Sequence, residues 1–228
     1  MIRAFLVIML LFQLVSAGCS VSRQPGRPLD DPVLSQGLRQ KLERLYPRSF
    51  QASHRCILEA AGRQFVLEGY LRVYEPESFR LLAKGDMGGT VFELQQVKGE
   101  KPQVVKNPVS LRPAWLLEGA ARDISVLYFR SPPPQARLVR YQTGDLGLAQ
   151  EVKPGLWEEF HFQPETGRLL AYMLTQGGGP IYRADFGYFE ALSPGGREVP
   201  RTITIVDHRM HYRLTVRVVD FTELTGNP

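Results

Sequence analysis

The sequence of 228 residues is 43% hydrophobic and 22% charged, which excludes an intrinsically disordered chain and a polytopic membrane protein and leaves room for one well-buried domain. The formal net charge is +5 and the sequence pI is about 9.3. Lys and Arg are scattered among Glu and Asp and nowhere form the dense block of a nucleic-acid footprint, so we expect no nucleic-acid partner.

Residues 1–18 have the build of a secretory signal peptide. Arg3 precedes an apolar run from Ala4 to Leu14, and three small residues follow at 16–18. The run is too short for a membrane-spanning helix, which needs about 20 apolar residues. We therefore expect a removable export signal here.

The stretch LVSAGCS, residues 14–20, resembles the lipobox of bacterial lipoproteins, in which the cysteine is lipidated and becomes the first mature residue. The resemblance implies three acyl chains on Cys19, and several chains give stable membrane anchoring. Ser20 is not the Asp that typically retains a lipoprotein in the inner membrane, which implies the periplasmic face of the outer membrane. Ser16 stands where a lipobox usually has Leu, so cleavage by an ordinary signal peptidase before Gly18 is the alternative.

Residues 19–31 are predicted to be a lipidated N-terminus and flexible tether, because the segment SVSRQPGRPLDDP has three prolines and no apolar periodicity. One folded domain should occupy residues 32–228. Asp31 can cap a helix that has Pro32 at its first position, and leucines recur at helical spacing from Leu34 until Tyr46-Pro47.

Alternating apolar and polar residues then predict antiparallel strands over 49–60, 64–74, 78–84 and 90–97, with a short strand near 104–105. The third and fourth strands are joined by KGDMGG, which is longer than a tight hairpin needs and places Met87 among glycines. Such a methionine can fold back over the sheet as a gap filler or project into solvent.

A second amphipathic helix is predicted from the spacing of Trp115, Leu116, Ala120, Ile124 and Leu127, and the segment SPPPQ ends it. Strands resume over 137–142, 155–162, 168–175, 181–192, 201–206 and 211–221. The sequence thus predicts a mainly β fold with two helices, in which a curled antiparallel sheet of about 10 or 11 strands forms an incomplete barrel under a helical lid.

This order of elements on an exported lipoprotein resembles the LolA/LolB-like family, whose incomplete barrels carry lipoprotein acyl chains. The matching stretches are ESFRLLAKGDMGGTVFEL and the C-terminal run from YFEALSPGG to VVDFTEL, and the resemblance covers most of residues 32–224. In LolB-like receptors an apolar residue at the tip of the corresponding hairpin projects into solvent and is linked to delivery to the membrane. Met87 occupies the matching place.

The resemblance implies an apolar cavity that accepts acyl chains or another hydrophobic ligand. The candidate lining residues lie on one face of the strands and on the second helix. They are Phe65, Leu67, Leu71, Phe79, Leu81, Phe92, Leu94, Trp115, Leu116, Ile124, Phe160, Tyr172, Phe186, Ile203, Leu214 and Val216.

The sequence contains little that indicates an enzyme. Glu158 and Glu159 are adjacent in a strand and must point to opposite faces, so they cannot act as a carboxylate pair. His208 and His211 fall in a predicted turn, where polar residues are expected without a metal. Cys56 alternates with apolar residues and is expected to be a buried thiol. We expect no catalytic residues, no metal and no cofactor.

The sequence therefore predicts a non-enzymatic, membrane-anchored monomer that binds an acylated or hydrophobic ligand, with a role in lipoprotein localisation implied by the resemblance. Its expected partners are membrane lipid, bound through the N-terminal acyl anchor, the hydrophobic or acylated ligand, and a periplasmic carrier protein. The alternative is a structural or assembly lipoprotein with a solid core that binds a partner protein and carries no lipid.

Overall fold

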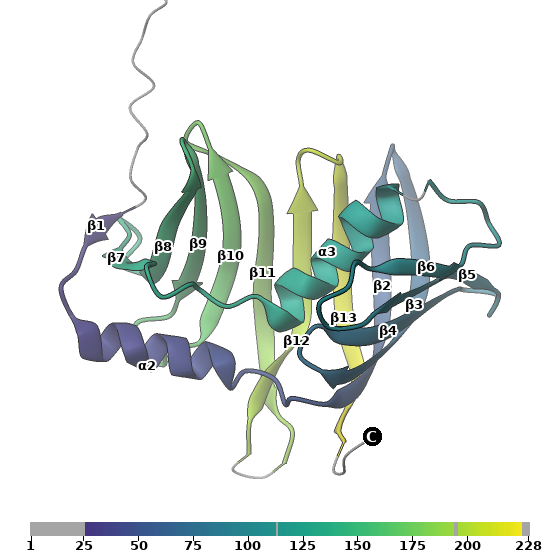
Figure 1. The fold of residues 1–228 in the computed structure, drawn as a ribbon, viewed down its shortest axis with the longest axis horizontal. Helices are drawn as coiled ribbons and strands as arrows, with labels where there is room; N and C mark the ends of the chain where they lie inside the picture. Colours follow the sequence, from purple (N-terminus) through teal and green to yellow (C-terminus); the bar gives the residue numbers. More distant parts are fainter. Residues whose placement is uncertain (1–25, 113, 194–195, 225–228) are drawn as a thin grey trace, which may run out of the picture.

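The computed structural model describes residues 26–112, 114–193 and 196–224. Its strands form one antiparallel 13-stranded sheet in the order β1-β7-β8-β9-β10-β11-β12-β13-β2-β3-β4-β5-β6. β1 and β6 are the edges and do not pair, so the sheet is curled and open (Figure 1). This confirms the predicted incomplete barrel. The strands are β1 (Arg27–Pro28), β2 (Phe50–Ala60), β3 (Arg63–Glu75), β4 (Ser78–Gly85), β5 (Thr90–Gln96), β6 (Gln103–Lys106), β7 (Arg137–Arg140), β8 (Leu146–Lys153), β9 (Leu156–Phe162), β10 (Leu169–Gln176), β11 (Gly179–Ala191), β12 (Glu198–Asp207) and β13 (Tyr212–Glu223).

Helix α2 (Pro32–Glu43) begins as the sequence predicts. The Asp31 carboxylate accepts a hydrogen bond from the Leu34 amide at 2.9 Å, and Pro32 needs no donor at the first helical position. Leu38 is buried on its apolar side. The Arg39 guanidinium donates to the carbonyls of Pro132, Pro133, Pro134 and Ala136 at 2.6–3.2 Å, which ties α2 to the proline-rich segment.

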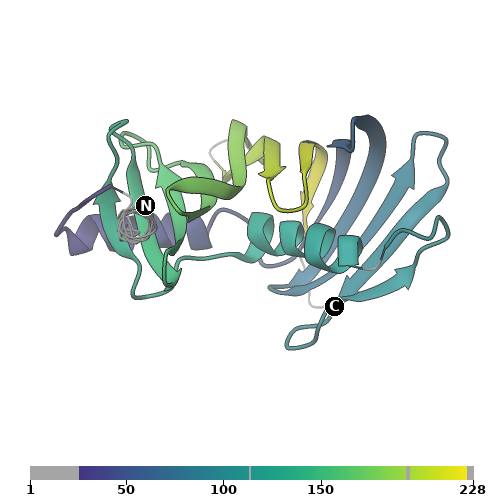
Figure 2. The same cartoon turned by 90° about the horizontal axis from the view of Figure 1, so that it is seen from above.

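The second predicted helix is present, but most of it is not α-helical. Two π-helical segments, η1 (Trp115–Ala120) and η2 (Ser125–Phe129), flank the short α3 (Ala121–Ile124). We call residues 115–129 the lid helix. It lies across β13, β2 and β3, whereas α2 lies near β8–β11 at the other end of the sheet (Figures 1 and 2). π-helical turns are rare and occur mostly as single turns at functional sites.

Two strands were not expected from the sequence. β1 falls in the predicted tether, where Arg27 and Pro28 pair with Arg140 and Val139. β8 lies in residues 143–154, between two predicted strands, where no strand was predicted. Its Gly147 leaves room for the Tyr141 ring, since a Cβ there would lie 2.3 Å from Tyr141 Cε2. Gly147 is typical of a loop in the sequence, but here it allows the Tyr141 ring to pack closely against the strand.

The buried side chains form two clusters on the concave face. The lid cluster lies beneath the lid helix and contains Phe50, Ala52, Leu71, Val73, Phe79, Ala83, Phe92, Leu94, Leu116, Ala121, Ile124 and Val218. The α2 cluster contains Leu38, Ala60, Leu127, Ala136, Leu138, Leu146, Leu148, Phe160, Phe162, Leu169, Tyr172, Tyr182, Ala184, Phe186, Ile203, Ile205, Tyr212 and Val216. Tyr128 of the lid helix packs against both clusters and joins them.

Candidate functional site beneath the lid helix

The predicted lining residues mostly meet on one face of the sheet. Eleven are buried: Leu71, Phe79, Phe92, Leu94, Leu116 and Ile124 in the lid cluster, and Phe160, Tyr172, Phe186, Ile203 and Val216 in the α2 cluster. Leu81 and Leu214 are half-buried against these clusters. Leu67 is half-buried outside both.

Two of the predicted lining residues are exposed. The side chain of Phe65 is 45% exposed and belongs to neither cluster, although its cross-strand neighbour Leu58 packs against the α2 cluster. Trp115 is 38% exposed at the first turn of the lid helix. Neither residue therefore contributes to the enclosed interior. Period-two alternation assigns a residue to a face of the sheet but does not say how far along the strand that face is covered.

The interior is closed in this conformation. A cavity between α2, the lid helix and the sheet has a volume of about 20 Å³ and is lined by residues that include Leu42, Leu127, Tyr128, Phe160 and Tyr172. A space of that size holds about one water molecule. Pockets for drug-sized ligands are typically about 300–1,000 Å³. An acyl chain can enter only if the lid helix or α2 moves.

A buried carboxylate ties the middle of the lid helix to the sheet. Asp123 is 4% exposed and accepts hydrogen bonds from the hydroxyls of Tyr182 at 3.1 Å and Tyr212 at 2.6 Å. Beside it, Arg122 Nη2 lies 2.6 Å from Asp207 Oδ2 at the end of β12. Burial raises the pKa of Asp123 to about 6, although the hydrogen bond from Tyr212 and the charge of Arg122 oppose this shift.

A second polar tie holds the C-terminal end of the lid helix. The Tyr128 hydroxyl lies 2.7 Å from His54 Nε2 on β2. Burial lowers the pKa of His54 to about 4, against a hydrogen bond with the Gly69 backbone that favours the charged form. His54 is therefore neutral at pH 7, with one ring nitrogen toward Gly69 and the other free to accept from Tyr128.

A third tie follows directly after the lid helix. Arg130 Nε donates to Glu158 Oε1 at 2.5 Å, and Glu158 is fully buried in β9. The hydroxyl of Tyr172 and the amide of Gln150 also donate to Glu158, at 2.9 and 2.6 Å. Glu159 is turned to the opposite face, where Thr175 donates to it at 2.6 Å. The two glutamates do not form a catalytic pair.

The sequence did not predict these three sets of polar contacts, which are made by Asp123, Tyr128 and Arg130. The available signal was the pair Arg122-Asp123 and the hydroxyl of Tyr128 within a stretch that otherwise reads as a core-facing helix. Burying a charged pair among apolar positions costs free energy unless other residues supply hydrogen bonds or ion pairs to it. Those partners come from β2, β9, β11, β12 and β13, which are distant in sequence from the lid helix.

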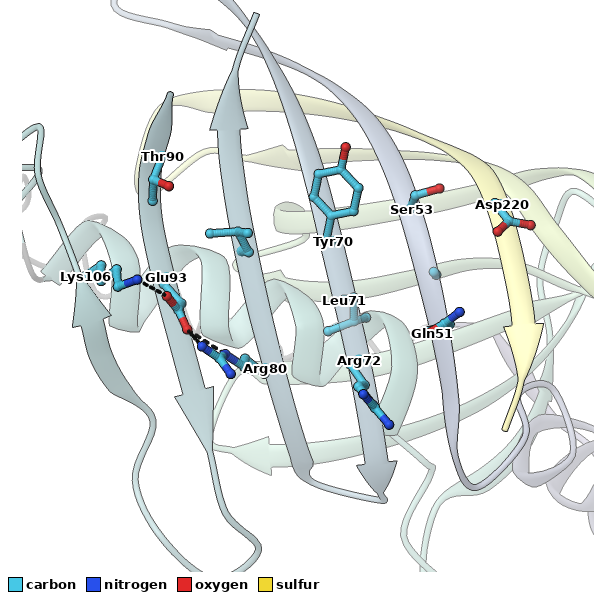
Figure 3. Close-up of a pocket in the computed structure, with 12 residues that line it drawn as sticks. Gln51, Ser53, Tyr70, Leu71, Arg72, Arg80, Thr90, Glu93, Lys106 and Asp220 are labelled. Carbon is cyan, nitrogen blue, oxygen red and sulfur yellow. Dashed lines mark hydrogen bonds and ion pairs between the residues drawn. The ribbon is translucent and has the colours of Figure 1, made fainter. Parts of the chain in front are cut away.

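The opposite face of the same sheet carries a separate groove of about 540 Å³, which is polar (Figure 3). Its side chains alternate with those of the lid cluster, so Tyr70 and Arg72 point away from the lid helix while Leu71 and Val73 point toward it. Glu93 is 2% exposed and lies between Arg80 at 2.5 Å and Lys106 at 3.6 Å. The Glu93 carboxylate is thus paired with two cations of the groove.

Met87 lies at the tip of the β4–β5 hairpin and is 96% exposed. The tip is closed by hydrogen bonds from the Gly88 amide to the Gly85 carbonyl and from the Gly85 amide to the Gly89 carbonyl, both at 2.9 Å. The Asp86 carboxylate accepts from the Met87 amide at 2.9 Å, and Gly88 has φ +81°. The loop is therefore an ordered turn that leaves the methionine side chain in solvent.

Cys19 and the predicted signal peptide lie outside the described residues. Cys56 is half-buried in β2, and burial raises the pKa of its thiol to about 12, which keeps it protonated. Within residues 26–112, 114–193 and 196–224, no three His, Cys, Asp or Glu side chains gather in a way that could hold a metal ion. Over the same ranges, no helix has the length and apolar character needed to span a membrane.

No protein family model and no curated protein matches the chain. Similar solved structures exist. A LolA superfamily protein from Nitrosomonas europaea superposes with a TM-score of 0.55 at 10% identity, covering 85% of this chain and 94% of that one. A putative outer membrane lipoprotein-sorting protein domain from Vibrio parahaemolyticus gives 0.51 at 12% identity, covering 83% and 92%.

A DUF1329 family protein from Desulfovibrio piger has a TM-score of 0.52 at 9% identity, covering 86% of this chain and 95% of that one. At such identities the likeness establishes the fold alone. The chain therefore has a LolA/LolB-like fold, as the resemblance in sequence indicated.

Acid should loosen the Tyr128–His54 tie. Neutral His54 stabilises the fold fully above its unfolded pKa of about 6.5, and this contribution is lost as the pH falls toward the folded pKa of about 4. Between about pH 7 and pH 5 the free energy of unfolding of the wild type should fall by about 2 kcal/mol more than that of His54→Gln, as urea titrations would measure. Equal pH dependence in the two proteins would contradict a buried neutral histidine.

Proposed function

We propose that the protein is a periplasmic lipoprotein anchored to the outer membrane that binds acyl chains, or another hydrophobic ligand, between the sheet and the lid helix. The observation that carries this proposal is the pair of apolar clusters joined beneath one helix that has π-helical turns at both ends. Polar ties at Asp123, Tyr128 and Arg130 close that helix over them.

The arrangement suits reversible opening. If the lid helix lifts, the freed polar groups of the ties can bond to water, while an acyl chain can replace the apolar contacts that the helix leaves. Burial of a ligand chain is worth roughly 25 cal/mol per Å² of apolar surface. The solved structure described as a lipoprotein-sorting domain supports a role for this chain in lipoprotein localisation.

A second candidate function is supported by the closed interior. With a cavity of about 20 Å³, the domain can equally be a solid scaffold that binds a partner protein on its surface and carries no lipid. The two functions differ in whether ligand can displace the lid helix, so ligand uptake separates them.

Weakening the central tie should speed ligand uptake. The double variant Tyr182→Phe Tyr212→Phe removes both hydroxyl donors to Asp123. Each hydrogen bond contributes about 0.5–1.5 kcal/mol, so uptake of a fluorescent fatty acid should become about tenfold faster. Tyr70→Phe is the control, because its hydroxyl bonds to Glu68 on the opposite, exposed face.

Native mass spectrometry of the purified full chain gives the companion measurement, which looks for co-purified lipid. A wild type without lipid, combined with no uptake by either the wild type or the double variant, would reject the carrier function and leave the partner-binding scaffold.

The N-terminal anchor has its own test. Cys19→Ala should move the protein from the membrane fraction to the soluble periplasmic fraction, because it removes the acylated thiol. Cys56→Ala is the matched control and should stay with the membrane. Membrane attachment of Cys19→Ala would contradict the proposed lipidation.

We also propose that Met87 contacts the membrane or the acylated cargo during transfer. Met87→Glu should leave the melting temperature unchanged, since the side chain is 96% exposed, and should lower ligand transfer to phospholipid vesicles. Val33→Glu is a suitable control, because Val33 is 80% exposed on α2 at a different part of the surface. Equal transfer by Met87→Glu and Val33→Glu would rule out a special role for the hairpin tip.

A further inference from the structure

A second groove lies between the C-terminal half of α2, the turn that connects β9 to β10, and residues 197–198 at the start of β12. It has a volume of about 470 Å³, and we call it the α2 groove. Its apolar walls include Leu42, Leu45 and Leu169, and these three leucines also line the small interior cavity. Only a layer of side chains therefore separates this groove from the apolar interior.

The rim of the α2 groove is cationic. Lys41, Arg44, Arg168 and Arg197 line it, together with a single carboxylate, Glu198. Arg168 is fully engaged, because its guanidinium binds both oxygens of Glu198 at 2.6–2.9 Å and lies over the Phe189 ring. The remaining three cations have no carboxylate within the groove to neutralise them.

Two of these cations have a partial structural explanation. Lys41 and Arg44 lie at the C-terminal end of α2, where positive charge is favourable to the helix dipole. Lys41 Nζ also donates to the Thr166 carbonyl at 2.5 Å. Its position depends on Gly167, whose φ is +64° and where a Cβ would lie 2.9 Å from Lys41 Nζ. A backbone position that only glycine fills well thus holds this ammonium group at the rim.

The contacts of Arg197 leave its guanidinium incompletely paired. Its Nη1 atom is buried and has no hydrogen-bond acceptor among the residues that the structure describes. Its ion-pair partner is Glu223, whose Oε2 atom lies 3.9 Å from Nη1, too far for a hydrogen bond. A buried donor left unpaired typically costs about 1–3 kcal/mol. An anion in the α2 groove would supply the missing acceptor.

We propose that the α2 groove binds the anionic head group of an amphiphile whose acyl chain passes between α2 and β10 into the interior. The head group would be a phosphate or a carboxylate bound by Arg197 and Arg44, with Lys41 beside them. The three leucines that line both the α2 groove and the interior cavity give the direction in which the acyl chain would run. This inference rests on the proposed function, and it names the ligand class as an anionic lipid or acyl acid.

The test compares amphiphiles that share one chain and differ in head group. Hexadecyl phosphate, hexadecanol and hexadecyltrimethylammonium are titrated against the purified full chain by displacement of a fluorescent fatty acid, with inorganic phosphate as a further competitor. Hexadecyl phosphate should bind at least about tenfold more tightly than hexadecanol, because one hydrogen bond to a charged group is worth about 1.5–3 kcal/mol.

The variant Arg44→Gln Arg197→Gln should weaken binding of hexadecyl phosphate by about tenfold or more and leave hexadecanol unchanged. Arg55→Gln is the matched control, because Arg55 is exposed on β2 and does not line the groove. Should the double variant fail to fold, Arg44→Gln alone keeps the test valid, since Arg44 is exposed and makes no side-chain hydrogen bond or ion pair in the described part of the chain.

The outcomes separate the two proposals. If no amphiphile binds, the proposed function fails and this inference fails with it. If all three amphiphiles bind equally and the arginine variants change nothing, the ligand function stands and the head-group site is overturned. If inorganic phosphate competes as strongly as hexadecyl phosphate, the groove is a simple anion site, and the amphiphile is overturned in the same way.

Discussion

The concave face of the open sheet carries nearly all the large buried side chains, and this surface must be covered for the chain to fold. A closed barrel would cover such a face with its own opposite wall. Here β1 and β6 do not meet, so α2 and the lid helix provide the cover. Helix α2 packs on one cluster, whereas the lid helix packs on the other and also contributes Leu127 to the α2 cluster; Tyr128 contacts both.

The lid helix is attached differently from α2. Its apolar residues fill the lid cluster, but Asp123, Tyr128 and Arg130 also bond to buried partners on four separate strands. A buried charge is tolerated only while its partners are in place. The lid helix therefore has one well-defined closed position, and leaving it requires several polar groups to be rehydrated together. That is the physical basis for a cover with two discrete states.

Burial alone does not distinguish a ligand site from a packed core. In the closed conformation the interior retains about 20 Å³, which is what a well-packed domain would show. The proposed ligand function and head-group site rest instead on polar groups in places where a simple core would not need them. These are the carboxylate of Asp123 under the lid helix and the guanidinium of Arg197 at the α2 groove.

The sequence by itself determined the antiparallel sheet, because period-two alternation depends only on the pleat of a strand, and it placed both helices through apolar spacing and the Asp31-Pro32 cap. It also identified most of the buried lining residues, such as Leu71 and Ile203, since their face follows from their position in a strand. Other features were decided only by tertiary contacts. A glycine is needed at position 147 because the Tyr141 ring packs against it, and Phe65 is exposed although its cross-strand neighbour Leu58 packs against the α2 cluster. Asp123 can be buried because Tyr182 and Tyr212, 59 and 89 residues away along the chain, donate to it. Such partners are set by the curl of the sheet, which local sequence patterns do not encode.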